Sequence, residues 1–154
     1  MRLTHYTDYA LRLLIYVGVK APAAGTIADA AAAYGISKNH LMKIAQDLGR
    51  AGYLETMRGR GGGLRLALPP ESIKIGRVAA SCEGKNPLVE CFDPISNQCV
   101  ITPVCGLIHM LSSAERAFFA ELDRHTLADL IGQQDGLLAL WARQTNSLPN
   151  SKAC

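Results

Sequence analysis

The sequence predicts a mainly α-helical fold with one small β-hairpin and a long helix towards the C-terminal end. Two observations predict the helices: apolar residues recur every three or four positions through much of residues 6–51, and again over residues 107–122. A third predicts the hairpin, because leucines alternate at 64–68 after a glycine-rich stretch. The 154 residues, 49% of them hydrophobic, are enough for one cored domain and an additional arm.

Capping signals divide the first part of the chain into three helices. The first is expected over residues 6–18, where apolar side chains share one face. Thr26 and Asp29 form the capping box of a short second helix, which Gly35 ends in the left-handed conformation. A third helix follows at once, with Ser37 as its predicted N-cap.

Two short helices joined by a tight turn make a helix-turn-helix, which places its second helix in the major groove of DNA. Polar and basic residues occupy the outward face of this second helix. We expect DNA contacts from Ser37, Lys38, Asn39, His40 and Lys43. A solvated helix surface carries similar residues, so the next segment decides the interpretation.

That segment predicts two short strands joined by a turn of glycine and arginine, residues 58–63. Glycines let the tip of such a hairpin approach a DNA backbone, and Arg58 and Arg60 are expected to contact phosphates or enter the minor groove. The sequence therefore predicts a winged helix-turn-helix over residues 1–80 that binds double-stranded DNA.

The charge distribution agrees with a polyanionic partner. Residues 1–70 hold nine Lys or Arg against four Asp or Glu, whereas residues 71–154 hold seven against nine. No apolar stretch approaches eighteen residues and no signal-peptide cleavage site is evident, so we expect a cytoplasmic protein without a membrane partner.

A long amphipathic helix is predicted beyond the wing. Thr102 and Pro103 are typical of an N-cap and a first helical position. The apolar stripe that follows consists of Leu107, Leu111, Ala114, Phe118 and Leu122. Such a face can pair with the same helix of a second subunit, although packing on its own domain remains the alternative. Pairing would make a homodimer that reads an inverted repeat.

Three of the five cysteines lie close together in the chain. Cys91, Cys99 and Cys105 are spaced C-x7-C and C-x5-C, with a proline between each pair. An odd number of cysteines in a cytoplasmic protein favours metal binding or redox chemistry over disulfides. The lack of a C-x2-C pair counts against a zinc ribbon, though a Cys3His zinc site with His109 stays open. No C-x-x-C pair or activated nucleophile is evident, so no enzyme is expected.

The stretches MRLTHYTDYALR and RGRGGGLRL, together with the three-cysteine loop before a long helix, resemble the winged-helix regulators of the NsrR and IscR family. The resemblance implies a homodimeric transcription factor whose three cysteines hold an iron-sulphur cluster. IscR-like members carry a histidine three residues after the last cysteine, where this chain has Ile108. The resemblance therefore favours the nitric-oxide-sensing repressors of the family, in which nitrosylation of the cluster releases the operator.

Three cysteines leave a 4Fe-4S cluster one ligand short. The resemblance points to an acidic residue on the first helix of the other subunit, which here is Asp8. An ion pair with Arg12 is the ordinary alternative for Asp8, while His109 and Cys82 are competing ligands. Cys105, in the predicted first turn of the long helix, lies where the helix dipole favours a thiolate.

These interpretations divide the chain into four parts. They are the winged domain, a cluster-binding loop at 81–105, a dimerisation helix with a C-terminal helical segment at 106–143, and a polar disordered tail at 144–154. Two other functions stay open: a related cluster-binding regulator that senses oxidation or iron-sulphur status, and a zinc- or thiol-stabilised regulator without a cluster.

Overall fold

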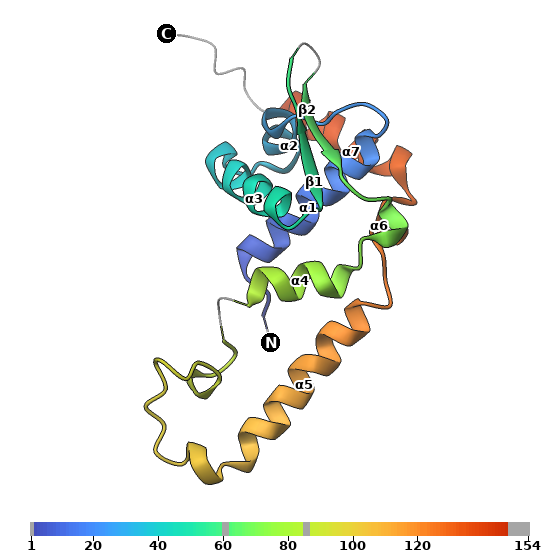
Figure 1. Cartoon of the computed structure of the whole chain (residues 1–154). Helices are drawn as coiled ribbons and strands as arrows, with labels where there is room; N and C mark the ends of the chain where they lie inside the picture. Colours follow the sequence, from blue (N-terminus) through green and yellow to red (C-terminus); the bar gives the residue numbers. More distant parts are fainter. Residues whose placement is uncertain (1, 60–61, 85–86, 148–154) are drawn as a thin grey trace.

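The computed structural model describes residues 2–59, 62–84 and 87–147, which form a helical unit with a β-hairpin and a projecting arm (Figure 1). The helices are α1 (His5–Lys20), α2 (Ile27–Tyr34), α3 (Lys38–Arg50), α4 (Ile75–Glu83), α5 (Gly106–Leu122), α6 (Leu127–Ile131) and α7 (Gln134–Ser147). The strands are β1 (Leu54–Met57) and β2 (Gly63–Leu66), and 3-10 turns span Pro70–Ser72, Glu90–Phe92 and Thr102–Val104. The predicted fold class is confirmed. Within the described ranges, no helix is both long and apolar enough to cross a membrane.

The helix-turn-helix consists of α2 and α3. The hydroxyl oxygen of Thr26 accepts a hydrogen bond from the backbone N–H of Asp29 at 3.0 Å, and Gly35, at φ 65°, ends α2 as predicted. Ser37 occupies the N-cap position of α3 as predicted, but its side chain makes no capping hydrogen bond. Burial of the preceding Ile36 fixes the entry of the chain into α3 instead.

The hairpin joins the helical unit through a third, short backbone pairing. Leu64 of β2 exchanges two backbone hydrogen bonds, of 3.0 and 2.7 Å, with Gly25 in the loop after α1. A side chain at Gly63 would lie 2.6 Å from the carbonyl oxygen of Gly25, so this close approach requires glycine. The predicted leucine alternation extends too far, because Leu68 lies beyond β2 and is 41% exposed.

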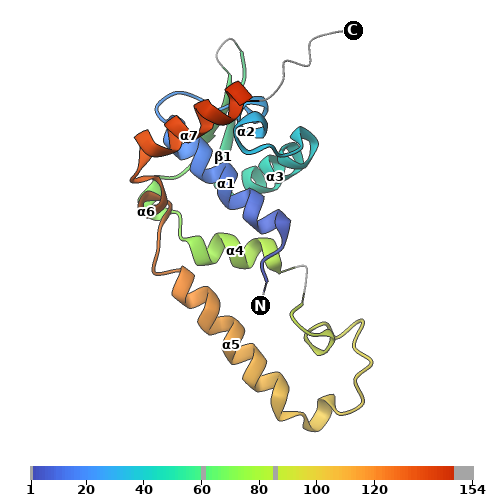
Figure 2. The same ribbon diagram turned by 180° about the vertical axis from the view of Figure 1, so that it is seen from behind.

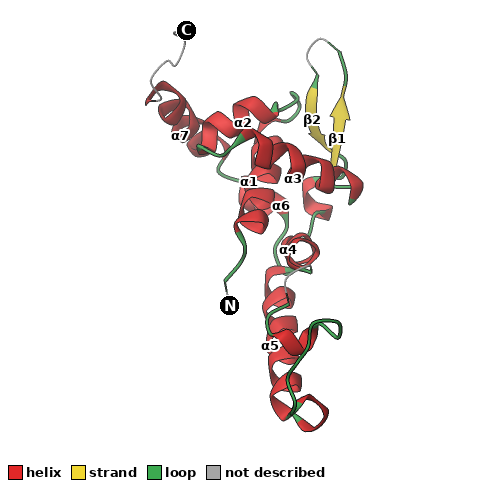
Figure 3. Ribbon diagram, turned by 90° about the vertical axis from the view of Figure 1, so that its left-hand side faces the viewer, coloured by secondary structure: helices red, strands yellow, loops and turns green. Residues whose placement is uncertain are grey.

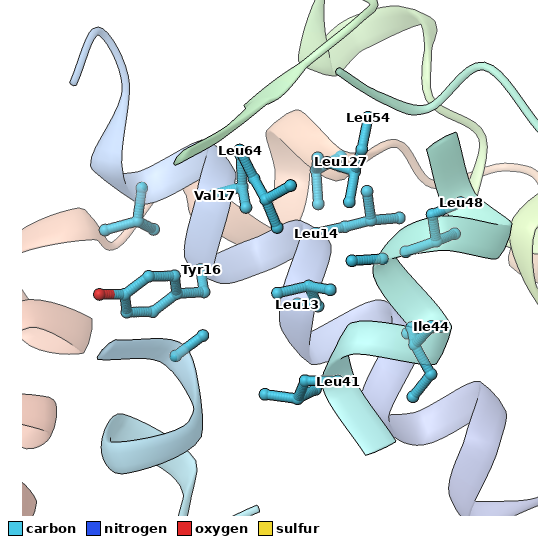
Figure 4. Close-up of a cluster of buried hydrophobic side chains, with 14 of the residues drawn as sticks. Leu13, Leu14, Tyr16, Val17, Leu41, Ile44, Leu48, Leu54, Leu64 and Leu127 are labelled. Atoms are coloured by element: carbon cyan, nitrogen blue, oxygen red, sulfur yellow. The ribbon is translucent and has the colours of Figure 1, made fainter. Parts of the chain in front are cut away.

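The hydrophobic core lies between α1, α3 and the hairpin. Its buried side chains include Leu13, Leu14, Val17, Leu41, Ile44, Leu48, Leu54, Leu64 and Leu127 (Figure 4). Complete burial of such a side chain contributes about 1.5–3 kcal/mol, so the core holds α3 firmly against α1.

The two C-terminal helices return to this core after the arm. Leu127 of α6 is fully buried, and Trp141 of α7 packs against Tyr16 and Tyr34 with ring centroids 5.1 and 5.4 Å apart. The side-chain amide of Gln134 also donates to the backbone carbonyl of Val19 at 2.7 Å. The winged unit is therefore assembled from two chain segments that flank the arm (Figure 2).

The arm consists of α5 and the loop before it, and Figure 3 shows it extending away from the winged unit. α5 crosses α4 closely at Gly76, where an added Cβ would lie 2.1 Å from the carbonyl oxygen of Phe119. No residue of α5 is buried, and Leu107 and Met110 are 56% and 70% exposed. The start of the apolar stripe of α5, at Leu107, is thus open to solvent in this chain, whereas Leu111, Phe118 and Leu122 are partly buried.

The long helix begins later than predicted. Thr102 and Pro103 belong to a 3-10 turn, and Cys105, at φ −79° and ψ 109°, is extended before α5 begins at Gly106. The hydroxyl of Thr102 donates to the carbonyl of Cys99 at 2.8 Å, which explains why it does not cap the helix. Cys105 therefore occupies the N-cap position and not the first turn.

Candidate nucleic-acid interface and iron site

α3 exposes one side along its whole length. The five residues of this region predicted to contact DNA, Ser37, Lys38, Asn39, His40 and Lys43, are all exposed. Met42 is exposed as well, at 44%, although its apolar side chain gave no sequence signal for the outer face. The surface offered to a groove is therefore polar and basic with one apolar side chain in it.

A partly buried hydrogen bond holds α3 against α1. The hydroxyl of Tyr6 donates to a carboxylate oxygen of Asp47 at 2.6 Å. Burial and, next, this hydrogen bond to a carboxylate raise the pKa of Tyr6 above its ordinary value, so its hydroxyl remains a donor well into the alkaline range. Asp47 also pairs with Arg50 at 3.3 Å, which orients the basic end of α3.

The wing presents an arginine next to a tight glycine turn. Arg58 follows β1 directly and is exposed. Gly59 has φ 98°, and a side chain at Gly62 would lie 2.5 Å from the carbonyl oxygen of Met57, so both positions require glycine. Arg60, the second arginine predicted to contact DNA, lies outside the described residues.

Local hydrogen bonds shape the loop that carries Cys91, Cys99 and Cys105. The backbone N–H of Cys99 donates to the side chain of Asn97 at 3.0 Å, and turns at 90–92 and 102–104 flank it. All three thiols are partly exposed and free. Among the described residues, no three His, Cys, Asp or Glu side chains lie close enough together to hold a metal ion. The loop therefore supplies three accessible soft donors but does not gather them in this structure.

Asp8 lies in the first turn of α1. Figure 1 shows the start of α1 apart from the loop that joins α4 to α5. The carboxylate of Asp8 forms a two-point ion pair with Arg12, at 2.9 and 3.0 Å, and both side chains remain over 40% exposed. The ion pair that the sequence suggested is therefore present. Such an exposed pair is worth under about 1 kcal/mol, so it holds Asp8 only weakly.

The two competing fourth ligands, His109 and Cys82, line different clefts. One, of about 600 Å³, lies between the end of α4, the loop and α5, and its lining includes Cys91, His109 and Glu115. The other, of about 540 Å³, lies between α1, α3 and α4 and is lined by Cys82 and Lys43. Burial raises the pKa of the Cys82 thiol, which disfavours the thiolate that a metal requires.

A carboxylate that sequence reasoning missed joins α4 to the start of α1. Glu83 accepts hydrogen bonds from the backbone N–H of Thr4 at 2.7 Å, from the Thr4 hydroxyl at 2.9 Å, and from the hydroxyl of buried Thr7. An anion at this place also meets the positive end of the α1 dipole. The first turn of α1, which contains Asp8, is thereby tied to the helix that leads into the cysteine loop.

Comparison with known proteins identifies the class of molecule that carries these features. The profile of the Rrf2 family, described as iron-dependent transcriptional regulators, matches residues 3–133. The chain belongs to the Rrf2 family. It is 50% identical over 141 residues to the HTH-type transcriptional regulator NsrR of Bacillus subtilis, covering 91% of this chain and 97% of that protein. The chain is also 49% identical to the NsrR of Geobacillus kaustophilus, in an alignment that covers 91% of this chain and 96% of that protein.

Solved structures agree on the fold. An IscR structure from T. potens has a TM-score of 0.69 with 19% sequence identity, over 86% of this chain and 88% of that one. CymR of B. subtilis, titled the global cysteine regulator, has a TM-score of 0.68 with 24% identity, over 86% and 98%. This member of the Rrf2 family is therefore a DNA-binding transcriptional regulator of the NsrR type with a winged-helix fold, and not an enzyme.

Proposed function

We propose that the chain is a homodimeric transcriptional repressor that senses nitric oxide through a 4Fe-4S cluster. In this proposal Cys91, Cys99 and Cys105 hold the cluster, and its reaction with nitric oxide releases the operator. The regulator class and the iron dependence of the family support the proposal. So does the resemblance of the cysteine loop and the first helix to nitric-oxide-sensing members.

The observation that carries the proposal is the loop itself. It offers three partly exposed thiols, and the hydrogen bonds around Cys99 join residues of the loop to one another, so the loop can close around a group without breaking the core. Thiolates are the usual ligands of iron-sulphur clusters, so the donor chemistry fits. When bound, the cluster would supply iron atoms open to attack by a small gas.

Asp8 is the proposed fourth ligand, supplied by the partner subunit. Its carboxylate is 41% exposed and only weakly held by Arg12. Oxygen ligation of iron among thiolates is mismatched in softness and easily displaced, which suits a sensor. Because Glu83 ties the first turn of α1 to α4, Asp8 would join the cluster of one subunit to the DNA-binding unit of the other.

Dimerisation is proposed through α5. Leu107 of its stripe is 56% exposed, the neighbouring Met110 is 70% exposed, and no residue of α5 is buried within the single chain. A second copy of the same helix would cover this face and place two α3 helices on an inverted repeat. The polar residues of α3 and its N-cap would then contact the major groove: Ser37, Lys38, Asn39, His40 and Lys43. Arg58 and Arg60 of the wing would contact the flanking backbone.

Anaerobic purification followed by visible absorbance and iron and sulphide analysis tests the cofactor. A stoichiometric nitric oxide titration, with operator affinity measured at fixed salt, then tests the signal. The operator is a duplex that the protein itself selects from a randomised pool. We expect a coloured dimer whose affinity falls at least about tenfold with nitric oxide, which corresponds to about 1.4 kcal/mol.

Each other outcome points to a different regulator. A colourless protein that contains zinc and still binds DNA would overturn the cluster and favour the Cys3His site, because His109 lines the same cleft as Cys91. A coloured protein that ignores nitric oxide but responds to oxygen or iron withdrawal would keep the cluster and overturn the signal. A monomer that binds single half-sites would overturn the assignment of α5.

A further inference from the structure

Met42 interrupts the division of α3 into a buried and a polar side. The other large apolar residues of the helix, Leu41, Ile44 and Leu48, are at most 2% exposed, whereas Met42 is 44% exposed. An exposed methionine is ordinary on most surfaces. On the outer side of α3, which is proposed to enter the major groove, it would face base edges.

The neighbours of Met42 on the helix surface are amides. Asn39 precedes it by three residues and Gln46 follows it by four, so both adjoin it on the same side of α3. Both are exposed. Asn and Gln pair in two-point fashion with adenine through N6 and N7, whereas Lys43 is suited to phosphate or guanine.

An apolar side chain has one good partner in the major groove. Every other base edge offers donors or acceptors, and burying them against a methionine would leave them without hydrogen bonds, at a cost of about 1–3 kcal/mol each. The C5 methyl group of thymine is the exception. We propose that Met42 contacts a thymine methyl group and that Asn39 and Gln46 bond to adenine, so that each half-site carries A·T pairs opposite this part of α3. This rests on the proposed DNA face of α3.

Deoxyuridine provides the test, because it differs from thymidine only by that methyl group. The iron-containing protein is measured anaerobically, at fixed salt, on the selected duplex and on duplexes in which each thymine of one half-site is replaced in turn. At one or two positions we expect affinity to fall about fourfold, the factor for the roughly 0.8 kcal/mol of one buried methyl group. The Met42→Ala protein should bind the parent duplex more weakly and show no further loss at those positions. Met42→Leu keeps an apolar contact, so deoxyuridine at those positions should still lower its affinity nearly as much as it lowers the affinity of the parent.

Met57→Ala is the matched control, because Met57 is also partly exposed, at 36%, but lies on β1 of the wing. It should lose affinity at the same deoxyuridine positions as the parent protein. The inference is overturned if no replacement weakens the parent, or if Met42→Ala loses as much as the parent at every position. Lys43→Ala separates this from failure of the DNA face. Suppose that Lys43→Ala lowers operator affinity and reduces the slope of log affinity against log salt by about 0.9, while Met42→Ala and the parent respond alike to deoxyuridine. In that case the DNA face of α3 holds and only the thymine contact is wrong.

Discussion

Replacement of Gly76 by alanine should loosen the joint between the arm and the winged unit. The new Cβ would lie 2.1 Å from the carbonyl oxygen of Phe119 and 2.7 and 2.8 Å from the backbone nitrogen and a carboxylate oxygen of Asp123. Backbone atoms cannot turn aside as a side chain can, so α5 must move by roughly 1 Å in a close-packed contact. The movement would also disturb the 2.7 Å hydrogen bond from the backbone N–H of Arg77 to Asp123.

The expected cost follows from these contacts. Overpacking usually costs about 1–3 kcal/mol, and a clash with backbone belongs at the upper end. Alanine recovers under about 1 kcal/mol through its higher helix propensity. We therefore expect Gly76→Ala to lower the free energy of unfolding by about 2 kcal/mol, and to weaken binding to the paired operator more than to a half-site.

Urea unfolding followed by fluorescence measures this effect, because Trp141 is the single tryptophan and lies in the winged unit. Gly136→Ala in α7 is the control, since an added Cβ there meets no atom within 4 Å. That variant should gain about 0.5–1 kcal/mol. Two results would show that the crossing of α4 and α5 is not closely packed in solution. In one, the Gly76→Ala protein is as stable as the parent; in the other, Gly136→Ala lowers the free energy of unfolding as much as Gly76→Ala does.

Three further predictions concern the cluster and the tie between helices. Cys99→Ser should remove the visible absorbance, whereas Cys82→Ser should keep it; colour that survives the loss of Cys99 would exclude it as a ligand. Asp8→Ala should stay coloured but bind the selected operator about tenfold more weakly, as a gel-shift titration can show, although removal of an anion alone would strengthen binding. His109→Ala should stay coloured and keep the operator affinity of the parent, and loss of its cluster would make His109 the fourth ligand. Glu83→Ala should lower the free energy of unfolding by about 1–3 kcal/mol in urea titrations, because a buried hydroxyl loses its acceptor; an unchanged midpoint would refute that role.

Local signals predicted the local structure well. α2 begins after Thr26 and ends before Gly35 as expected, because a cap depends on atoms only a few residues apart. The start of α5 was wrong for the same kind of reason: a threonine followed by proline suits a 3-10 turn as well as a helix start, and the Thr102 hydroxyl bonds to Cys99 instead. Periodicity also could not show that Leu127 and Trp141 return to the core, because it identifies a buried face but not its partner.

The candidate site likewise contains features that the sequence predicted and features that it did not. The sequence supplied the identities of the three loop cysteines and the basic residues of α3, since residue type and spacing suffice for that. It could not supply the bonds from Glu83 to Thr4 and Thr7, which join residues 76 or more positions apart. Met42 escaped for a different reason: an apolar residue within a helical pattern is normally assigned to the core, and only its exposure reveals otherwise.

The two ends of α4 are held by bonds of different kinds, and this affects how freely the sequence can vary. At the first end, backbone bonds join Ile75 to His125 and Ile73 to Leu127, at 3.1 and 2.9 Å, and the carboxylate of Asp123 adds a bond from the backbone N–H of Arg77. Backbone groups are common to nearly all residue types, so many substitutions at His125 would preserve that attachment. At the other end, a single carboxylate at Glu83 makes the connection. A substitution at Asp123 would therefore leave the two backbone bonds of the first end in place, whereas a single point mutation at Glu83 can abolish the bonds at the other end, nearer the cysteines.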